Sequence, residues 1–226
     1  MATFVLVHGA WHGGWCWRDV ATELRAAGHD VHTPTLSGCG EKARLAPHVD
    51  LSVHVDELAN LLYFADLREV VLVGHSYGGL PVTGAAARFG ARIARLVYLD
   101  AFVADDGQSL LNLLRPERRK YYEESAADGL VPAPSPETLG VVEQADWLRD
   151  RLTPQPLKTF TEPLSASATP PVPRTYIRCT QGPMTPSFSG FAVRFRDTAG
   201  WDVVDFDSGH DAMITRPLDL AALLAT

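Results

Sequence analysis

The feature that most constrains the fold is a pentapeptide, Gly74-His75-Ser76-Tyr77-Gly78, which joins an apolar run to a small-residue-rich helical stretch. The run, residues 70–73, is typical of a parallel strand covered on both faces, and residues 80–89 are expected to form a helix. A Gly-x-Ser-x-Gly sequence in that context predicts a sharp turn that exposes the serine hydroxyl at the end of the strand. The glycines are needed because strand and helix pass too close for a Cβ atom. The alternative, a glycine-rich turn with an incidental serine, is disfavoured by the flanking strand and helix.

Short β-branched runs alternate with helical stretches along most of the chain. Six strands are predicted, over residues 4–7, 29–33, 70–73, 96–99, 175–179 and 201–206. Four helices are predicted, over residues 19–27, 52–66, 80–89 and 218–224. This alternation implies βαβ units and therefore an α/β fold, with a mostly parallel sheet flanked by helices on both faces.

The alternation breaks between residues 103 and 173, where two helical stretches, 108–124 and 136–152, lie among prolines. The second stretch has one apolar face, made of Val141, Ala145, Leu148 and Leu152. Amphipathic helices need a surface to pack on, so we expect an inserted helical cap and not a linker. The predicted division is a core of residues 1–102 and 174–226 and a cap of residues 103–173.

Composition excludes several function classes. The chain carries 27 acidic and 20 basic residues, and no basic cluster is dense enough to follow a phosphate backbone, which argues against nucleic acid. Three cysteines without a CxxC spacing argue against a disulfide framework and fit a reducing cytoplasm. We see no signal peptide and no membrane-spanning run. We therefore expect a cytoplasmic chain that acts on a small molecule without membrane or nucleic-acid partners, and its oligomeric state does not follow from sequence.

Ser76 is the candidate nucleophile. On such a turn the backbone N–H that follows the serine, here that of Tyr77, points at the oxyanion that forms when the hydroxyl attacks a carbonyl carbon. A second N–H comes from the loop after the first strand. In this chain His8-Gly9-Ala10 follows that strand, and we predict that Ala10 supplies the donor.

The candidate base is His210. It ends Ser208-Gly209-His210, which follows the last predicted strand, and every histidine other than His75 and His210 precedes the pentapeptide. In α/β sheets that carry a serine at such a turn, the histidine comes last in chain order. Position therefore predicts that His210 takes the proton of Ser76.

Four motifs together resemble one family. HGAWHGGWCW near the start, GHSYGG in the middle, LVYLDAF after it and SGHDAM near the end resemble the plant methylesterase and hydroxynitrile lyase group of the α/β-hydrolase superfamily. They are still more similar to its bacterial ester-hydrolase relatives, including pyrethroid-hydrolysing carboxylesterases. The resemblance covers most of the chain and is weakest across residues 103–173. It implies a core sheet with a helical lid, catalysis without a cofactor, and an oxyanion hole formed by Ala10 and Tyr77.

The acid departs from the pattern of this group. The resemblance puts the group's aspartate after the strand 175–179, where this chain has Gln181 and Gly182, neither of which is an acid. Asp100 is the best substitute, because it ends the strand 96–99 and the carboxyl ends of the two strands open at the same edge. Triads are defined by geometry and not by sequence position, so we predict that Asp100 faces His210.

Alternatives to this acid remain open. In the first alternative, Asp100 has no catalytic role and only holds the start of the cap. In the second alternative, the catalytic acid is Asp207 or Asp211, although Asp211 adjoins His210 and would have to fold back on its neighbour. The site would otherwise be a dyad of Ser76 and His210.

Lyase chemistry is disfavoured. As the resemblance has it, members that cleave cyanohydrins carry a threonine after the first-loop histidine and a lysine after the catalytic histidine. This chain has Gly9 and Asp211 at those places, and an aspartate would repel departing cyanide. We expect a serine carboxylic-ester hydrolase that acts on a small apolar or aromatic ester through an acyl-enzyme. The alternatives are a lyase or natural-product tailoring enzyme using the same pocket, and a small-molecule receptor with weak turnover.

Candidate substrate-binding residues are aromatic: Trp11, Tyr77, Phe102 and Trp147. Aromatic residues near a cap are more often core packing, so packing is the alternative for each of them. No HExxH, HxxE or CxxC spacing supports a metal site, and we expect no metal or other cofactor.

Overall fold

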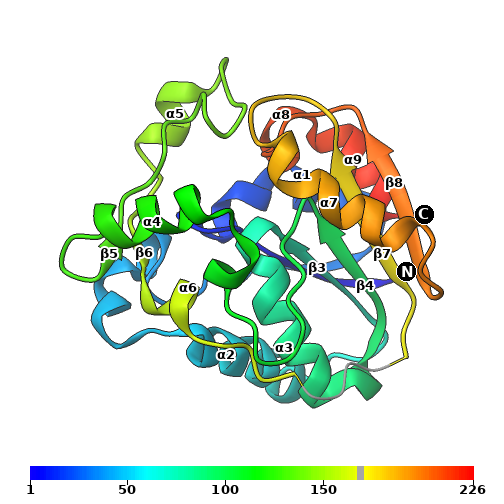
Figure 1. The fold of residues 1–226 in the computed structure, drawn as a ribbon. Helices are drawn as coiled ribbons and strands as arrows, with labels where there is room; N and C mark the ends of the chain where they lie inside the picture. Colours follow the sequence, from blue (N-terminus) through cyan, green and yellow to red (C-terminus); the bar gives the residue numbers. More distant parts are fainter. Residues whose placement is uncertain (167–170) are drawn as a thin grey trace.

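A single sheet organises the fold (Figure 1). The computed structural model describes residues 1–166 and 171–226. The sheet has six strands in the order β2-β1-β3-β4-β7-β8, and the pairings within it are parallel. Its strands are β1 Thr3–Val7, β2 Asp30–His32, β3 Val70–His75, β4 Ile93–Leu99, β7 Arg174–Cys179 and β8 Trp201–Phe206. The predicted α/β class, with a mostly parallel sheet flanked by helices, is confirmed.

Side chains of successive strand residues enter two cores on opposite faces of the sheet, as the period of two requires. Val5 and Leu72 belong to one core, and Phe4 and Val73 to the other. The first core is covered by α2 Leu51–Phe64, α3 Gly79–Phe89 and α7 Thr185–Arg196. The second core is covered by α1 Arg18–Ala26, α8 Ala212–Thr215 and α9 Pro217–Leu224.

Local signals explain where the long helices begin and end. The side chain of Asp50 accepts a hydrogen bond from the backbone N–H of Val53 and so caps α2. After α1, Gly28 adopts a φ of +86°, a conformation that glycine reaches without steric cost. Outside the insertion, the described residues form four 3-10 helices: η1 Gly14–Trp17, η2 Gly40–His48, η3 Ser76–Gly78 and η4 Gly90–Arg92. Among the described residues, no helix is long and apolar enough to span a membrane.

Between β4 and β7 the chain leaves the sheet for the segment that the sequence marks as an insertion. Its elements are η5 Leu110–Leu113, α4 Pro116–Ser125, β5 Leu130–Val131, α5 Ala145–Arg149, β6 Gln155–Pro156 and α6 Lys158–Thr161. β5 and β6 form a two-stranded antiparallel sheet. In Figure 1 this green and yellow-green segment extends from the sheet on the side opposite the chain termini. Residues 167–170 of the predicted cap lie outside the described residues.

The prediction of one continuous helix over residues 108–124 of this segment is wrong. The structure divides it into η5 and α4. The break precedes Pro116, because proline disfavours helical backbone in the residue before it. Arg115 accordingly has a ψ of 149°.

The second predicted helix, over residues 136–152, is mostly wrong. Only α5 is α-helical, because Gly140, with a φ of +84°, interrupts the preceding turn. The apolar pattern was nevertheless informative about burial. Val141 and Leu148 are fully buried and pack in the second core.

Candidate active site

Ser76 lies at the carboxyl end of β3 on the predicted sharp turn. Its φ of +52° is in the left-handed region, which is strained for a residue other than glycine. A Cβ atom on Gly74 would lie 2.7 Å from both the carbonyl oxygen of Gly78 and the side chain of Val82. A Cβ atom on Gly78 would lie 2.7 Å from the carbonyl oxygen of His8. The two glycines therefore permit the strand, the helix and the loop after β1 to meet at Ser76.

The loop after β1 lies directly against the serine. A Cβ atom on Gly9 would lie 2.9 Å from the Cβ of Ser76 and 2.8 Å from Nδ1 of His75. Ala10, the next residue, lines the same cavity as Ser76 and Tyr77. The structure thus brings the two predicted oxyanion donors and the predicted nucleophile together.

Asp100 and His210 meet through a short hydrogen bond. Nδ1 of His210 donates to Oδ2 of Asp100 at 2.7 Å, and both side chains are buried. The backbone N–H of Cys179, at the end of β7, donates to Oδ1 of Asp100 at 3.2 Å. Burial raises the pKa of the Asp100 carboxyl, and the hydrogen bond from His210 acts in the opposite direction. The carboxylate behind His210 therefore comes from β4, as predicted, and not from the position of Gly182.

Two aromatic rings fix the imidazole of His210. Phe188 of α7 stacks on it with centroids 4.8 Å apart and planes 13° apart. The ring of His75 lies 4.5 Å away, and its Nε2 donates to the backbone carbonyl of His210 at 3.0 Å. Because Nδ1 is used by Asp100, Nε2 is the nitrogen of His210 that remains available as a base. Within the described part of the chain, no hydrogen bond joins that ring to Ser76, and such bonds often tighten only when substrate binds.

The two alternative acids lie elsewhere. Asp207 is exposed and accepts a hydrogen bond from the side chain of Gln181 at 2.9 Å. Asp211 is fully buried, and its Oδ2 lies 3.0 Å from Nε2 of His12. Neither carboxylate contacts the imidazole of His210 through a hydrogen bond.

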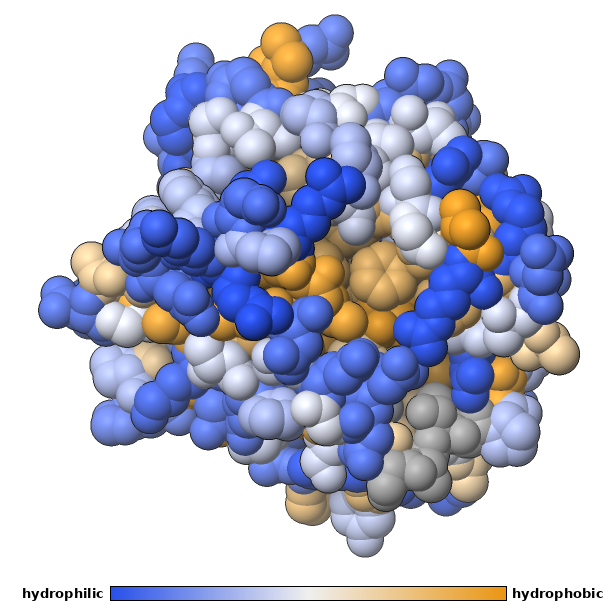
Figure 2. All heavy atoms as spheres, viewed as in Figure 1, coloured by the Kyte–Doolittle hydropathy of each residue, from blue (hydrophilic) through white to orange (hydrophobic). Residues whose placement is uncertain are grey.

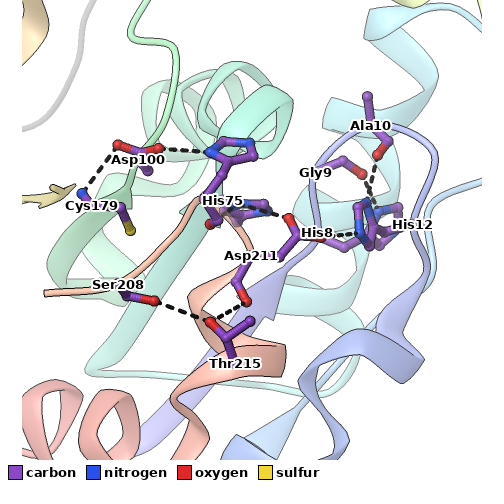
Figure 3. Close-up of polar contacts among 11 residues, drawn as sticks. His8, Gly9, Ala10, His12, His75, Asp100, Cys179, Ser208, Asp211 and Thr215 are labelled. Carbon is purple, nitrogen blue, oxygen red and sulfur yellow. Dashed lines mark hydrogen bonds and ion pairs between the residues drawn. The ribbon is translucent and has the colours of Figure 1, made fainter. Parts of the chain in front are cut away.

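The buried pair of Asp211 and His12 joins the loop after β8 to the loop after β1 (Figure 3). Nδ1 of His12 donates to the carbonyl of Ala10 at 2.7 Å, so both ring nitrogens face acceptors, an arrangement that favours the protonated ring. Burial lowers the pKa of His12, but the charge and hydrogen bond of Asp211 outweigh it and the net pKa is raised. Burial raises the pKa of Asp211, but His12 brings the net value below the ordinary one.

The side chain of Tyr77 is held at the wall of the site. Its hydroxyl donates to Nδ1 of His54 at 2.7 Å, and Nε2 of His54 donates to the carbonyl of Ser37 at 2.8 Å. Burial raises the pKa of the Tyr77 phenol well above its usual range. The phenol is therefore a neutral wall group, and only the backbone N–H of Tyr77 is a candidate for chemistry.

Ser76 opens into a narrow, mostly apolar cavity. Its lining consists of Ala10, Trp11, Ser76, Tyr77, Phe102, Leu110, Leu114, Arg118, Tyr122, Phe160, Met184 and Ser187. The space open to a water-sized sphere is about 20 Å³. Figure 2 shows an apolar hollow on this face, between the insertion and α7 of Figure 1, with hydrophilic residues around it. Three of the predicted aromatic wall residues, Trp11, Tyr77 and Phe102, belong to this lining.

Trp147, the fourth predicted wall residue, does not line the Ser76 cavity. It lies on α5 and meets the ring of Trp15 edge-on at 5.4 Å. The guanidinium of Arg151 lies 4.7 Å from its ring. The physical reason is that Leu148, on the same helix, packs in the second core, which holds α5 away from Ser76.

The sequence interpretation missed several residues of the site. Phe188 was missed because α7 was not predicted, although Phe188, Ala192 and Phe195 have helical spacing and are buried. Arg118, Tyr122 and Phe160 come from the insertion, whose fold the sequence pattern leaves open. The pairing of His12 with Asp211 has no local signal, since 199 positions separate them.

Comparisons with known proteins identify relatives of this chain. A model of the alpha/beta hydrolase family matches residues 4–223. A carbendazim-hydrolyzing esterase of Nocardioides sp. (strain SG-4G) is 42% identical over 240 residues, covering 100% of this chain and 99% of that protein. Methylesterase 4 of Arabidopsis thaliana is 42% identical over 105 residues, which are 45% of this chain and 40% of that protein.

A comparison with solved structures also finds alpha/beta hydrolases. An extracellular alpha/beta-hydrolase from a Paenibacillus species, described as sharing structural and functional homology with tobacco salicylic acid binding protein 2, superposes with a TM-score of 0.86. It is 26% identical, and the match covers 100% of this chain and 98% of that one. The resemblance to plant methylesterases and their bacterial relatives is therefore confirmed, and these relatives support esterase activity on an ester substrate. Its fold and its full-length matches show that the chain belongs to the alpha/beta hydrolase family.

Proposed function

We propose that the chain is a serine carboxylic-ester hydrolase that cleaves small apolar or aromatic esters through an acyl-enzyme. The observation that supports this most is the 2.7 Å hydrogen bond between His210 and Asp100 at the sheet edge where Ser76 follows β3. A carboxylate on Nδ1 leaves Nε2 of the histidine unprotonated and ready to accept a proton. Ser76 is the nucleophile, His210 the base and Asp100 the acid.

The proposed reaction has two halves. Nε2 of His210 removes the hydroxyl proton of Ser76 while Oγ attacks the ester carbonyl carbon, and Asp100 stabilises the imidazolium that forms. The N–H groups of Ala10 and Tyr77 bind the oxyanion. His210 then protonates the departing alkoxide, so that the alcohol leaves and the acyl group stays on Ser76. Water, deprotonated by the same nitrogen, attacks the acyl carbon. The bond from that carbon to Oγ of Ser76 then breaks, His210 returns the proton to Oγ, and the acid leaves.

The lining of the cavity supports the substrate class. Trp11, Phe102, Tyr122 and Phe160 surround the serine with aromatic surface, which favours flat apolar groups. The full-length Nocardioides relative is named for carbendazim, a methyl carbamate on an aromatic ring. We therefore include aromatic methyl esters and carbamates in the proposed class.

The test compares the wild-type chain with Ser76→Ala, using p-nitrophenyl acetate, methyl benzoate and carbendazim. We expect steady-state release of acid and alcohol by the wild type, and labelling of Ser76 by a fluorophosphonate. Ser76→Ala should lose at least about 10⁴-fold in kcat while its circular dichroism spectrum is unchanged. A variant that keeps most of the wild-type kcat would exclude the serine mechanism. Rearranged or cleaved products without hydrolysis would identify a lyase or tailoring enzyme, and binding without turnover would identify a receptor.

A further inference from the structure

A second cavity adjoins the Ser76 cavity. It holds about 250 Å³ and is lined by Trp11, Arg118, Tyr121, Tyr122, Pro132, Pro134, Ser135 and Thr138. Trp11, Arg118 and Tyr122 line both cavities. The two spaces therefore adjoin each other and share one wall, which these three side chains form.

Arg118 is the one charged side chain among the described residues that line the two cavities. It is half-buried, and its guanidinium lies 5.8 Å from the centre of the Tyr122 ring. It forms no ion pair with a described carboxylate, whereas Arg149 and Arg194 each pair with an acidic residue. This is notable in a chain whose net charge is −7. A partly desolvated cation without a counter-charge is costly, and it is the group that a bound anion would neutralise.

The chemistry of the guanidinium restricts the kind of ligand that can bind here. Its planar fork of N–H donors matches the two oxygens of a carboxylate and binds them with two parallel hydrogen bonds. The surroundings of this guanidinium are aromatic: the ring centroids of Trp11 and Tyr122 in the shared wall are 5.9 Å apart, and the ring of Phe160, which lines the Ser76 cavity, lies 5.4 Å from that of Tyr122. Such a site fits a carboxylate attached to an apolar or aromatic body.

We propose that the substrate spans both cavities and is a half-ester: an ester at Ser76, an apolar or aromatic body along the shared wall, and a carboxylate bound by Arg118. This inference rests on the proposed ester hydrolysis and adds the substrate class. The carboxylate takes no part in bond cleavage. Arg118 therefore contributes to binding and selectivity and should affect KM more than kcat.

The experiment uses the monomethyl esters of terephthalic, adipic and suberic acids, each compared with its uncharged dimethyl ester. The proteins are the wild type, Arg118→Gln, Arg118→Lys and the matched control Arg115→Gln. Arg115 is exposed and immediately precedes α4, the helix that carries Arg118. Steady-state kcat and KM are measured for every pair at low and at high salt, after circular dichroism has shown that each variant is folded.

We expect the wild type to prefer at least one half-ester over its diester by about 10-fold or more in kcat/KM, equivalent to about 1.4 kcal/mol. Arg118→Gln should abolish that preference, because it should raise KM for the half-ester about 10-fold more than KM for the diester. Arg118→Lys should retain part of the preference, and Arg115→Gln all of it. The preference should also weaken as salt rises.

Two other outcomes are distinguishable. In the first, Ser76 hydrolyses the diesters, but the half-esters are no better substrates in any pair, or Arg118→Gln changes kcat/KM for both esters equally. Either result would overturn the role of Arg118 and leave the proposed hydrolase function intact. Failure of the wild type on every ester, p-nitrophenyl acetate included, would overturn the proposed function and this inference with it.

Discussion

Nδ1 of His210 lies 2.7 Å from Oδ2 of Asp100, although 110 positions separate the two residues in the chain. In the sheet, β7 lies between β4, which ends at Leu99, and β8, which precedes the loop of His210. The carboxylate reaches the imidazole across the end of β7, where it also accepts the N–H of Cys179. This geometry occupies Nδ1 of the ring with Asp100 and leaves Nε2 for the proposed proton transfer from Ser76.

Replacement of Asp100 by Asn is expected to lower kcat on p-nitrophenyl acetate by about 10⁴-fold. Asparagine keeps the shape of the side chain and removes the charge that stabilises the imidazolium. The measurement is steady-state kcat, with circular dichroism to show that the variant is folded.

The matched control is Asp207→Asn, because Asp207 is exposed and contacts Gln181 and not His210. Its kcat should stay within a few-fold of wild type. If Asp100→Asn behaves like this control, the assignment of Asp100 is wrong and the site is a dyad of Ser76 and His210.

The buried pair of His12 and Asp211 should stabilise the fold, and Asp211→Asn should cost about 3–5 kcal/mol of unfolding free energy. The raised pKa of His12 gives stability that is present below the ordinary value of 6.5 and is lost as pH rises through the folded value. The lowered pKa of Asp211 gives stability that is present above 3.8 and is lost as pH falls through the folded value. The difference between wild type and variant should therefore be largest between 3.8 and 6.5.

Urea unfolding at a series of pH values measures this difference. Asp19→Asn is the control, because Asp19 forms an exposed ion pair with Arg18, and such pairs contribute at most about 1 kcal/mol. A difference between wild type and Asp211→Asn that does not vary with pH would contradict the ion pair. The burial of Asp211 also makes it unsuitable as a control for Asp100.

Gly9→Ala is expected to lower kcat by about 10²–10³-fold, the loss that follows removal of one oxyanion donor. The added methyl group would lie 2.8 Å from Nδ1 of His75 and 2.9 Å from the Cβ of Ser76. Relief of that overlap moves the loop and with it the N–H of Ala10. Gly190→Ala on α7 is the control, since nothing lies within 4 Å of its added Cβ. Equal kcat values for the two variants would mean that the loop tolerates displacement.

His8 should remain neutral in the folded protein across the physiological pH range. Burial is the main cause that lowers its pKa to about 3. Its Nδ1 donates to the carbonyl of Gly9 and its Nε2 accepts the N–H of Leu36, a pattern that only the neutral ring can make.

Because the folded pKa of His8 is below 6.5, its contribution to stability is present above that value and is lost as pH falls toward 3. The loss approaches about 1.4 kcal/mol per pH unit in this window. Imidazole chemical shifts followed by NMR should show no titration of His8 between about pH 5 and 8. A midpoint near 6.5 would show that the ring is accessible and that its contacts are weaker than the structure indicates.

Ser76 and His210 could be identified from sequence because each is specified by a few adjacent residues and by its place after a strand. Asp100 required one more step, the order of strands in the sheet, since no local motif marks it. The break in the helix at Arg115 could also have been predicted from sequence, because Pro116 follows Arg115. In these cases the physical signal is local or depends on simple topology.

Other features depend on contacts between distant segments and have no such signal. The pairing of His12 with Asp211 depends on two loops meeting at the sheet edge. Trp147 looked like a wall residue because it is aromatic and lies in the insertion, yet the burial of Leu148 directs α5 into the second core. Periodicity predicts that a face is buried but does not identify the surface that buries it.

The position of Asp100 also changes what the connection between β7 and α7 is free to do. With the proposed nucleophile and acid on β3 and β4, which pair in register at His75 and Leu99, the residues from Gln181 to Thr185 carry no part of the proposed proton relay. Gly182 has open space around it, with the nearest atom to an added Cβ 4.0 Å away. Natural or designed insertions at Gly182 would therefore alter the lining of the cavity at Met184 and leave the proposed acid in place, which makes this connection a place to graft new selectivity onto the scaffold.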